Sequence, residues 1–161
     1  MSRGLEATTL ATAVGCGLVG GVFFAFSTFV MRGLDRLPPA QGIAAMQSIN
    51  RTAVSPLFMA ALFGTGAACV GLMVWVVRAP GDQPVAWVLA GGALYIVGAL
   101  GVTVARNVPL NDTLAALDPH GAGAPGVWGG YLRDWTGWNH VRTVASLGSA
   151  ALLLVAQARG R

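Results

Sequence analysis

WGGYLRDWTGWNHVRT, residues 128–143, concentrates aromatic and polar side chains in a chain that is apolar almost throughout. The stretch holds three of the five tryptophans, a tyrosine, a histidine and two of the ten basic residues. Its large aromatic residues follow the spacing of one helix face, i, i+3, i+7 and i+10, at Trp128, Tyr131, Trp135 and Trp138. A largely apolar run, residues 144–158, follows directly. A polar cluster at the mouth of a membrane segment is costly to desolvate, so the stretch predicts a functional site.

Composition identifies an integral membrane protein. The chain is 55% hydrophobic and only 10% charged, whereas soluble domains carry about 25% charged residues. Its net charge of +4 comes from arginines that are scattered along the chain, which argues against a nucleic-acid-binding surface. Cys16 and Cys69 lie in apolar runs without the spacing of a redox or metal motif. We therefore expect both cysteines to be small packing residues.

Four apolar runs are long enough, or nearly long enough, to cross a bilayer as helices, which takes about 20 residues. They predict an all-α bundle of four transmembrane helices in a single membrane domain. The expected spans are residues 10–31, 56–77, 85–105 and 141–157. Residues 78–84 are expected to form a tight polar turn between the second and third spans.

The first span carries two patterns of its own. Small residues recur at every fourth position and predict a face on which helix backbones approach closely, at Ala13, Gly17, Gly21 and Ala25. Four phenylalanines crowd the far end of the span, at Phe23, Phe24, Phe26 and Phe29. These rings are compatible with an aromatic-substrate pocket, although packing against lipid or the core is the favoured interpretation.

The first and third loops each predict a short interfacial helix. In the first loop a Pro-Pro pair breaks the chain, and residues 40–54 then follow as a helix with apolar positions on one side. In the third, Pro109 disfavours helix at the preceding residue. The third span is therefore expected to break there, with a new short helix over residues 109–117. Residues 121–130 are expected to be a flexible, glycine-rich link.

Four crossings place both chain ends on one side of the membrane and gather the polar loop residues on the other. The residues that converge there are Arg32, Asn50, Arg51, Arg106, Asn107, Asn111, Trp135, Asn139, His140 and Arg142. Six arginines on the loop side, against four on the terminal side, weakly favour cytoplasmic loops. The expected setting is a multi-pass protein of the bacterial inner or plasma membrane.

The polar residues at this side argue against haem and di-iron sites and are compatible with acid–base chemistry. Two histidines do not supply the paired axial ligands of a transmembrane haem carrier, and no Glu-x-x-His pair supports a di-iron site. A single metal held by His140, with Asp112 or His120 folded back onto it, remains an alternative. The favoured hypothesis needs no cofactor: His140 is a general base, and Arg142 stabilises the resulting enolate or phenolate. A capping histidine and an arginine that contacts lipid headgroups fit the spacing equally well.

At these residues the sequence resembles a known family, the small four-helix membrane proteins related to anthrone oxygenase. The matching segments are residues 25–31 (AFSTFVM), 46–50 (MQSIN), 107–111 (NVPLN) and 135–143 (WTGWNHVRT). The resemblance implies a four-helix membrane protein. In the characterised members it implies oxidation of an anthrone-type polyketide to a quinone by molecular oxygen, a monooxygenase reaction without an evident cofactor.

Combined with the residue-level hypothesis, the resemblance suggests a role for each candidate. His140 would be the base and Arg142 the partner of the oxyanion. The residues expected to bind the substrate are Asn50, Arg51, Asn107, Asn111, Trp135, Trp138 and Asn139. The expected partners are an aromatic or polyketide molecule, O2 and the lipid bilayer, with a homo-oligomer also possible in principle and nucleic acid excluded.

A non-enzymatic membrane protein, either a small carrier or an assembly factor, is the alternative. A proton-coupled carrier of this size generally needs an acid within a span. Glu6, the only glutamate, precedes the first span. The sequence therefore favours the oxygenase over the carrier.

Overall fold

The computed structural model describes residues 3–78 and 84–160, and every regular element among them is helical. The elements are α1 (Arg3–Ala25), η1 (Phe26–Val30), α2 (Met31–Asp35), α3 (Pro39–Ala53), α4 (Pro56–Arg78), α5 (Val85–Ala93), η2 (Leu94–Gly101), η3 (Thr103–Asn107), α6 (Val108–Ala115) and α7 (Ala124–Arg159). The three η elements are π-helical. The predicted turn after the second span falls mainly on residues 79–83, outside the described part of the chain.

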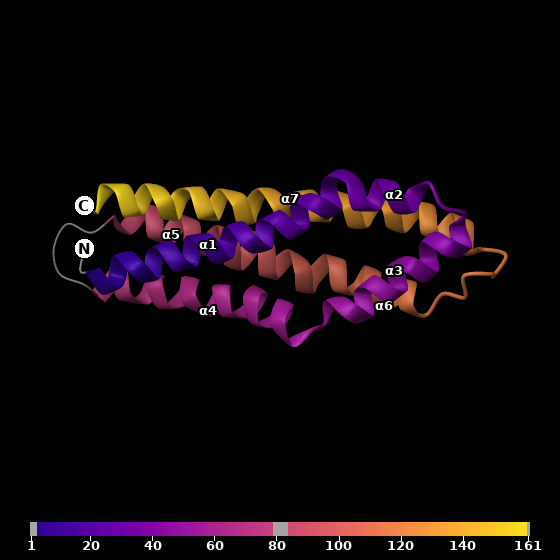
Figure 1. Cartoon of the computed structure of the whole chain (residues 1–161), viewed down its shortest axis with the longest axis horizontal. Helices are drawn as coiled ribbons and strands as arrows, with labels where there is room; N and C mark the ends of the chain where they lie inside the picture. Colours follow the sequence, from indigo (N-terminus) through magenta and orange to yellow (C-terminus); the bar gives the residue numbers. More distant parts are fainter. Residues whose placement is uncertain (1–2, 79–83, 161) are drawn as a thin grey trace.

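The elements join into four long helices, each long and apolar enough to cross a membrane. They comprise residues 4–35, 56–78, 85–115 and 124–159. The helices form a bundle in which α1 begins and α7 ends at the same end (Figure 1). This confirms the all-α, multi-pass four-helix fold that was predicted from the hydropathy pattern.

The bundle has a membrane part and a cap. α4 has 23 residues and is therefore about 34 Å long, close to the roughly 30 Å of a hydrocarbon core. The other three long helices continue past the start of α4, and there α3 packs on α2, α6 and α7 (Figure 1). We call this extension the cap. The predicted interfacial helix of the first loop is confirmed as α3.

The two parts have separate hydrophobic cores. The membrane core consists mainly of small and aliphatic residues, among them Ala13, Cys16, Val19, Cys69, Ala99 and Leu153. The cap core is built from larger side chains, among them Met31, Ile43, Met46, Trp128, Tyr131 and Trp135. In the cap, burial of aromatic area stabilises the helices, because each large ring removes 150–250 Å² from water.

The third helix does not break at Pro109, so that prediction is wrong. The helix continues from Val85 to Ala115, and the element just before the proline, η3, is π-helical. A proline ring clashes with the carbonyl of the preceding turn in a regular α-helix. A π-helical turn is wider and redirects that carbonyl, which lets the helix pass the proline. The predicted separate helix of the third loop is the end of this helix, α6.

The fourth helix also starts earlier than predicted. It begins at Ala124 rather than near Val141, so most of the expected flexible glycine link is helical. Pro125 lies in its first turn, where proline is tolerated. The aromatic face of the helix is buried in the cap core, which offsets the low helix propensity of its glycines.

The small-residue face of the first span was predicted on the wrong side of the helix. A Cβ added at Gly17 or Gly21 would meet no neighbouring atom among the described residues. Close packing occurs instead at Gly20, where a Cβ would lie 2.8 Å from Leu147 and 3.2 Å from Ser146. α1 and α7 therefore approach one another along a neighbouring stripe of α1.

Candidate functional site

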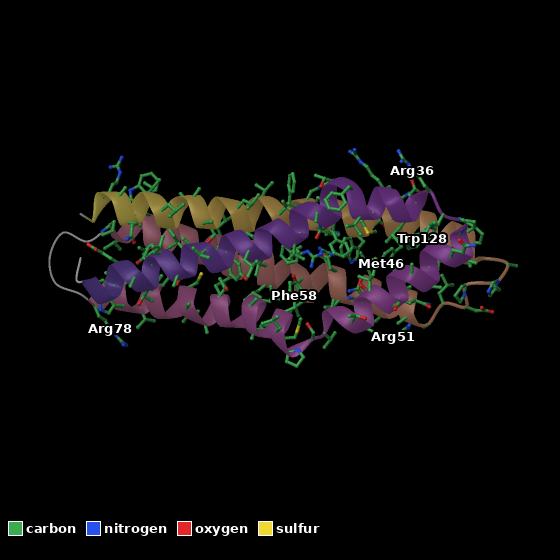
Figure 2. The ribbon with its side chains drawn as sticks, in the orientation of Figure 1. Arg36, Met46, Arg51, Phe58, Arg78 and Trp128 are labelled. Atoms are coloured by element: carbon green, nitrogen blue, oxygen red, sulfur yellow. The ribbon has the colours of Figure 1, made fainter. Side chains whose placement is uncertain are left out.

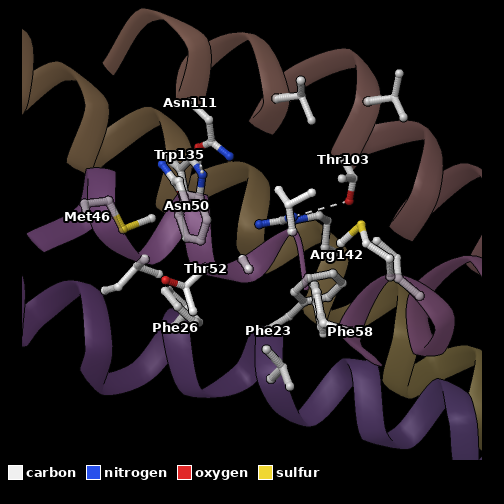
Figure 3. A pocket seen from close by; sticks show the side chains of 18 of the residues that line it. Phe23, Phe26, Met46, Asn50, Thr52, Phe58, Thr103, Asn111, Trp135 and Arg142 are labelled. Carbon is white, nitrogen blue, oxygen red and sulfur yellow. Dashed lines mark hydrogen bonds between the residues drawn. The ribbon is translucent and has the colours of Figure 1, made fainter. Parts of the chain in front are cut away.

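A cavity of about 750 Å³ lies where the membrane core meets the cap core (Figure 3). Its walls come from α1, η1, α3, α4, η3, α6 and α7, and most of them are apolar. The residues that line it include Phe23, Phe26, Met46, Asn50, Phe58, Thr103, Asn111, Trp135 and Arg142. A mostly apolar cavity of this size with a few convergent polar groups has the properties of a small-molecule site.

Arg142 is the charged group of the cavity, and only 5% of its surface is exposed. Its Nη2 donates to Asn139 Oδ1 at 2.7 Å, and its Nη1 donates to Thr103 Oγ1 at 3.3 Å. The guanidinium lies 4.3 Å from the ring centroid of Phe23 and 5.0 Å from that of Trp135. Its Nε has no hydrogen-bond partner in the described structure.

No described acidic side chain forms an ion pair with Arg142. Neutral acceptors and aromatic faces only partly replace the hydration that a buried cation loses. The cavity therefore contains a positive charge that no described acidic side chain compensates, beside apolar walls. An anion, or a group that becomes anionic, is the ligand that such a site stabilises most.

Asn139 holds Arg142 in place. This asparagine is fully buried, and its Nδ2 donates to Phe23 O and to Ser27 Oγ, each at 2.7 Å. These contacts orient the amide so that its Oδ1 is turned to the guanidinium. Asn139 therefore connects α1 to the charged group of α7 and is a positioning residue rather than a lining one.

A second polar region lies at the cap end of the cavity. Asn111 Oδ1 accepts from Tyr131 OH at 2.9 Å and from Trp135 Nε1 at 2.8 Å. Because an indole N–H can only donate, these bonds assign the Asn111 oxygen and leave its Nδ2 for another acceptor. Asn50 Nδ2 donates to Tyr131 OH at 3.4 Å. Figure 3 shows Asn50 and Asn111 together at one end of the cavity, and Arg142 and Thr103 at the other.

The two polar regions are separated along the bundle axis. Thr103 and Asn111 are eight residues apart on the third helix, which corresponds to about 12 Å of helix rise. Aromatic rings line the cavity between them, among them Phe26 and Trp135, whose centroids are 5.6 Å apart. The cavity therefore suits an extended flat ligand that has an anionic oxygen at one end and an acceptor oxygen at the other.

The structure brings together only some of the residues predicted from the sequence. Arg142, Trp135, Asn111 and Asn50 line the cavity. Asn107 is buried behind it, and its Nδ2 donates to Trp135 O at 3.2 Å. Its role is therefore to tie the third helix to α7.

Five of the predicted residues do not line the cavity, and the structure does not bring His140 together with Arg142 in it. His140 is exposed and lines a surface groove with Arg32 and Asp35. Residues two apart on a helix point in nearly opposite directions, so Arg142 faces inward where His140 faces outward. Trp138 is half-buried beneath Arg106, at 4.8 Å from its ring centroid.

Arg51 and the proposed metal centre do not belong to the cavity either. Arg51 is exposed and points away from the bundle (Figure 2). His120 lies exposed in the loop before α7. Within the described ranges, no three histidine, cysteine or acidic side chains are close enough together to hold a metal ion.

Some residues that line the cavity were not predicted as site residues from the sequence. Phe23 and Phe26 line the cavity, as the pocket interpretation of the phenylalanine cluster suggested, whereas Phe24 and Phe29 are exposed on the outer surface. The spacing of the four rings around the helix distinguishes these pairs. Thr103 carried no signal in the sequence, because a single threonine in an apolar span usually bonds its own helix.

Comparison with known proteins gives one match. A protein-family model described as anthrone oxygenase matches residues 54–152, which is well over half of the chain. The matched region contains α4, the third helix and most of α7, and therefore includes Asn111, Trp135 and Arg142. No curated protein and no solved structure matches the chain.

Proposed function

Since this chain belongs to the anthrone oxygenase family, we propose that it is a membrane-embedded oxygenase whose substrate is a flat aromatic molecule with an acidic C–H, of the anthrone type. The observation that carries the proposal is the buried Arg142, which faces an apolar cavity without an acidic partner among the described residues. Deprotonation of such a substrate places negative charge on its carbonyl oxygen. A guanidinium among mostly apolar walls stabilises that charge more than a fully hydrated arginine does.

The reaction balances with oxygen as the only co-reactant. Loss of a benzylic proton gives a carbanion, which transfers an electron to O2 and then forms a C–O bond to it. After protonation the product is a hydroperoxide, which loses water to leave a carbonyl. The overall change is from CH2 and O2 to C=O and H2O, so the anthrone becomes a quinone.

The role of the protein in this scheme is to bind and to stabilise charge. The described lining residues include no histidine, aspartate, glutamate or cysteine. We propose that the proton passes to water and that Arg142 makes this ionisation favourable, in place of the base role first assigned to His140. Asn111 Nδ2 would donate to a second substrate oxygen, and Phe23, Phe26 and Trp135 would form the flat walls. The same absence of ligand side chains around the cavity supports a reaction without a bound metal.

Oxygen uptake tests this proposal. Purified protein in lipid nanodiscs should consume O2 and form a quinone from an anthrone-type substrate, in a one-to-one ratio. Arg142→Met should lower the turnover strongly, while Arg106→Met, which removes an exposed arginine outside the cavity, should not. Normal turnover in Arg142→Met would contradict the proposed chemistry. So would a loss of turnover when a chelator removes one equivalent of a metal from the protein.

A further inference from the structure

We infer that the cavity opens sideways into the bilayer, between α4 and the third helix, and that its substrate is taken up from the membrane. The inference rests on the proposed function and narrows the substrate to aromatic molecules that partition into lipid. Three observations support it: which lining residues are exposed at the protein surface, how deep in the bilayer they lie, and how polar the residues at the opening are.

Four apolar residues both line the cavity and lie at the protein surface, and together they define the lateral opening. Val54 is 70% exposed, Phe63 52% and Val104 61%, and Val108 is also exposed. Side chains that enclose a sealed cavity are buried, so exposed lining residues mark the place where the cavity reaches the surface. The opening therefore extends from the α3–α4 corner across to η3 and α6.

Part of the lateral opening lies at the depth of the lipid chains. α4 matches the thickness of the hydrocarbon core, so its first residue, Pro56, marks the boundary of that core. Phe63 lies seven residues further along α4, or about 10 Å deeper. At that depth the exposed ring of Phe63 faces acyl chains rather than water.

The surroundings of the opening are polar only on the side of the cap. Ser48 and Thr52 of α3 line the cavity and are exposed there, and we call them the polar rim. Arg142 is the one charged residue among the described residues that line the cavity. A neutral flat molecule at the lipid interface can thus reach Arg142 without passing another charge and without first entering water.

The rates of ligand binding test the route. The probe is a fluorescent dihydroxyanthraquinone, a product-like molecule, mixed with the full chain in phosphatidylcholine nanodiscs. Val104→Trp should lower the association and dissociation rate constants together by about ten-fold and leave the Kd unchanged. Val97→Trp is the matched control, because Val97 is 69% exposed on the same helix, seven residues earlier, and does not line the cavity. It should change neither rate.

Further variants make the result decisive. Phe63→Ala widens the lateral opening and should raise both rate constants. Thr52→Trp obstructs the polar rim and should lower them much less than Val104→Trp does. Slow binding in Thr52→Trp with normal binding in Val104→Trp would overturn the inference and show uptake from water. Arg142→Met separates this outcome from failure of the proposed function: if that variant binds the probe as the wild type does, the function is wrong, whatever the route.

Discussion

Replacing Arg142 with methionine should abolish ligand binding without destabilising the fold. Methionine keeps an unbranched chain that packs against Phe23 and Trp135, but it removes the charge. For most buried polar residues, function and stability fall together. Here they should separate, because the free protein holds a buried cation that no described acid neutralises.

The two magnitudes follow from the contacts. An anionic oxygen in hydrogen-bond contact would lie about 4 Å from the guanidinium charge, which at an effective dielectric constant near 20 is worth about 4 kcal/mol. That energy corresponds to on the order of a thousand-fold in affinity. For folding, the variant leaves Asn139 Oδ1 without its partner at 2.7 Å, at a cost of about 1–3 kcal/mol. Removal of a buried charge relieves a desolvation cost of several kcal/mol. The net stability should be unchanged or higher.

Two assays on the same nanodisc sample check this prediction. Titration of the dihydroxyanthraquinone probe gives the affinity, and thermal unfolding followed by tryptophan fluorescence gives the stability. Arg106→Met is the control for the loss of one positive charge, because Arg106 is exposed and lies over Trp138 outside the cavity. An affinity within about three-fold of the wild type, or a clear loss of thermal stability, would refute the assignment of Arg142 as the anion-binding group.

Three further predictions concern residues placed differently by the structure. His140→Ala should keep near-normal turnover and an unchanged pH profile, because the side chain lies outside the cavity; a loss of about 10²-fold or more would restore histidine as the base. Asn139→Ala should raise KM and lower kcat, because Arg142 loses the acceptor that holds it in place. It should also lower the unfolding temperature, because the carbonyl of Phe23 loses its donor. Normal kinetics would show that Arg142 needs no positioning. Gly20→Leu should unfold at lower temperature than Gly17→Leu, because only Gly20 contacts α7, and equal melting of the two variants would contradict the observed packing.

The sequence was sufficient for the fold because bilayer thickness fixes the length of an apolar helix. The spans were found within a few residues at Pro56 and Val85, where charge and proline end the apolar runs. It failed where tertiary packing extends a helix beyond its apolar run. The fourth span was predicted to start near Val141, yet the rings of the aromatic stretch from Trp128 are buried in the cap core and belong to the same helix.

Only some of the residues predicted for the site line the cavity. Helix geometry divides the segment WTGWNHVRT, residues 135–143: Trp135, Asn139 and Arg142 face inward, and His140 faces outward. The face that turns inward depends on the partners of the helix, which a single sequence does not supply. The same uncertainty placed the close-packed stripe of α1 at Gly17 rather than Gly20.

The π-helical turns beside the cavity, η1 and η3, have a consequence for how related sequences should be compared. Each such turn accommodates one residue more than an α-helical turn, so it resets the angular phase of everything that follows by about 100°. On the third helix, η3 lies between the membrane half and Asn111, and it sets the direction in which that amide points. A one-residue insertion or deletion at this place in a relative is therefore not a neutral length difference. It rotates the cap end of the helix against the membrane end and changes which side chains the ligand meets, although the hydropathy of the span stays the same.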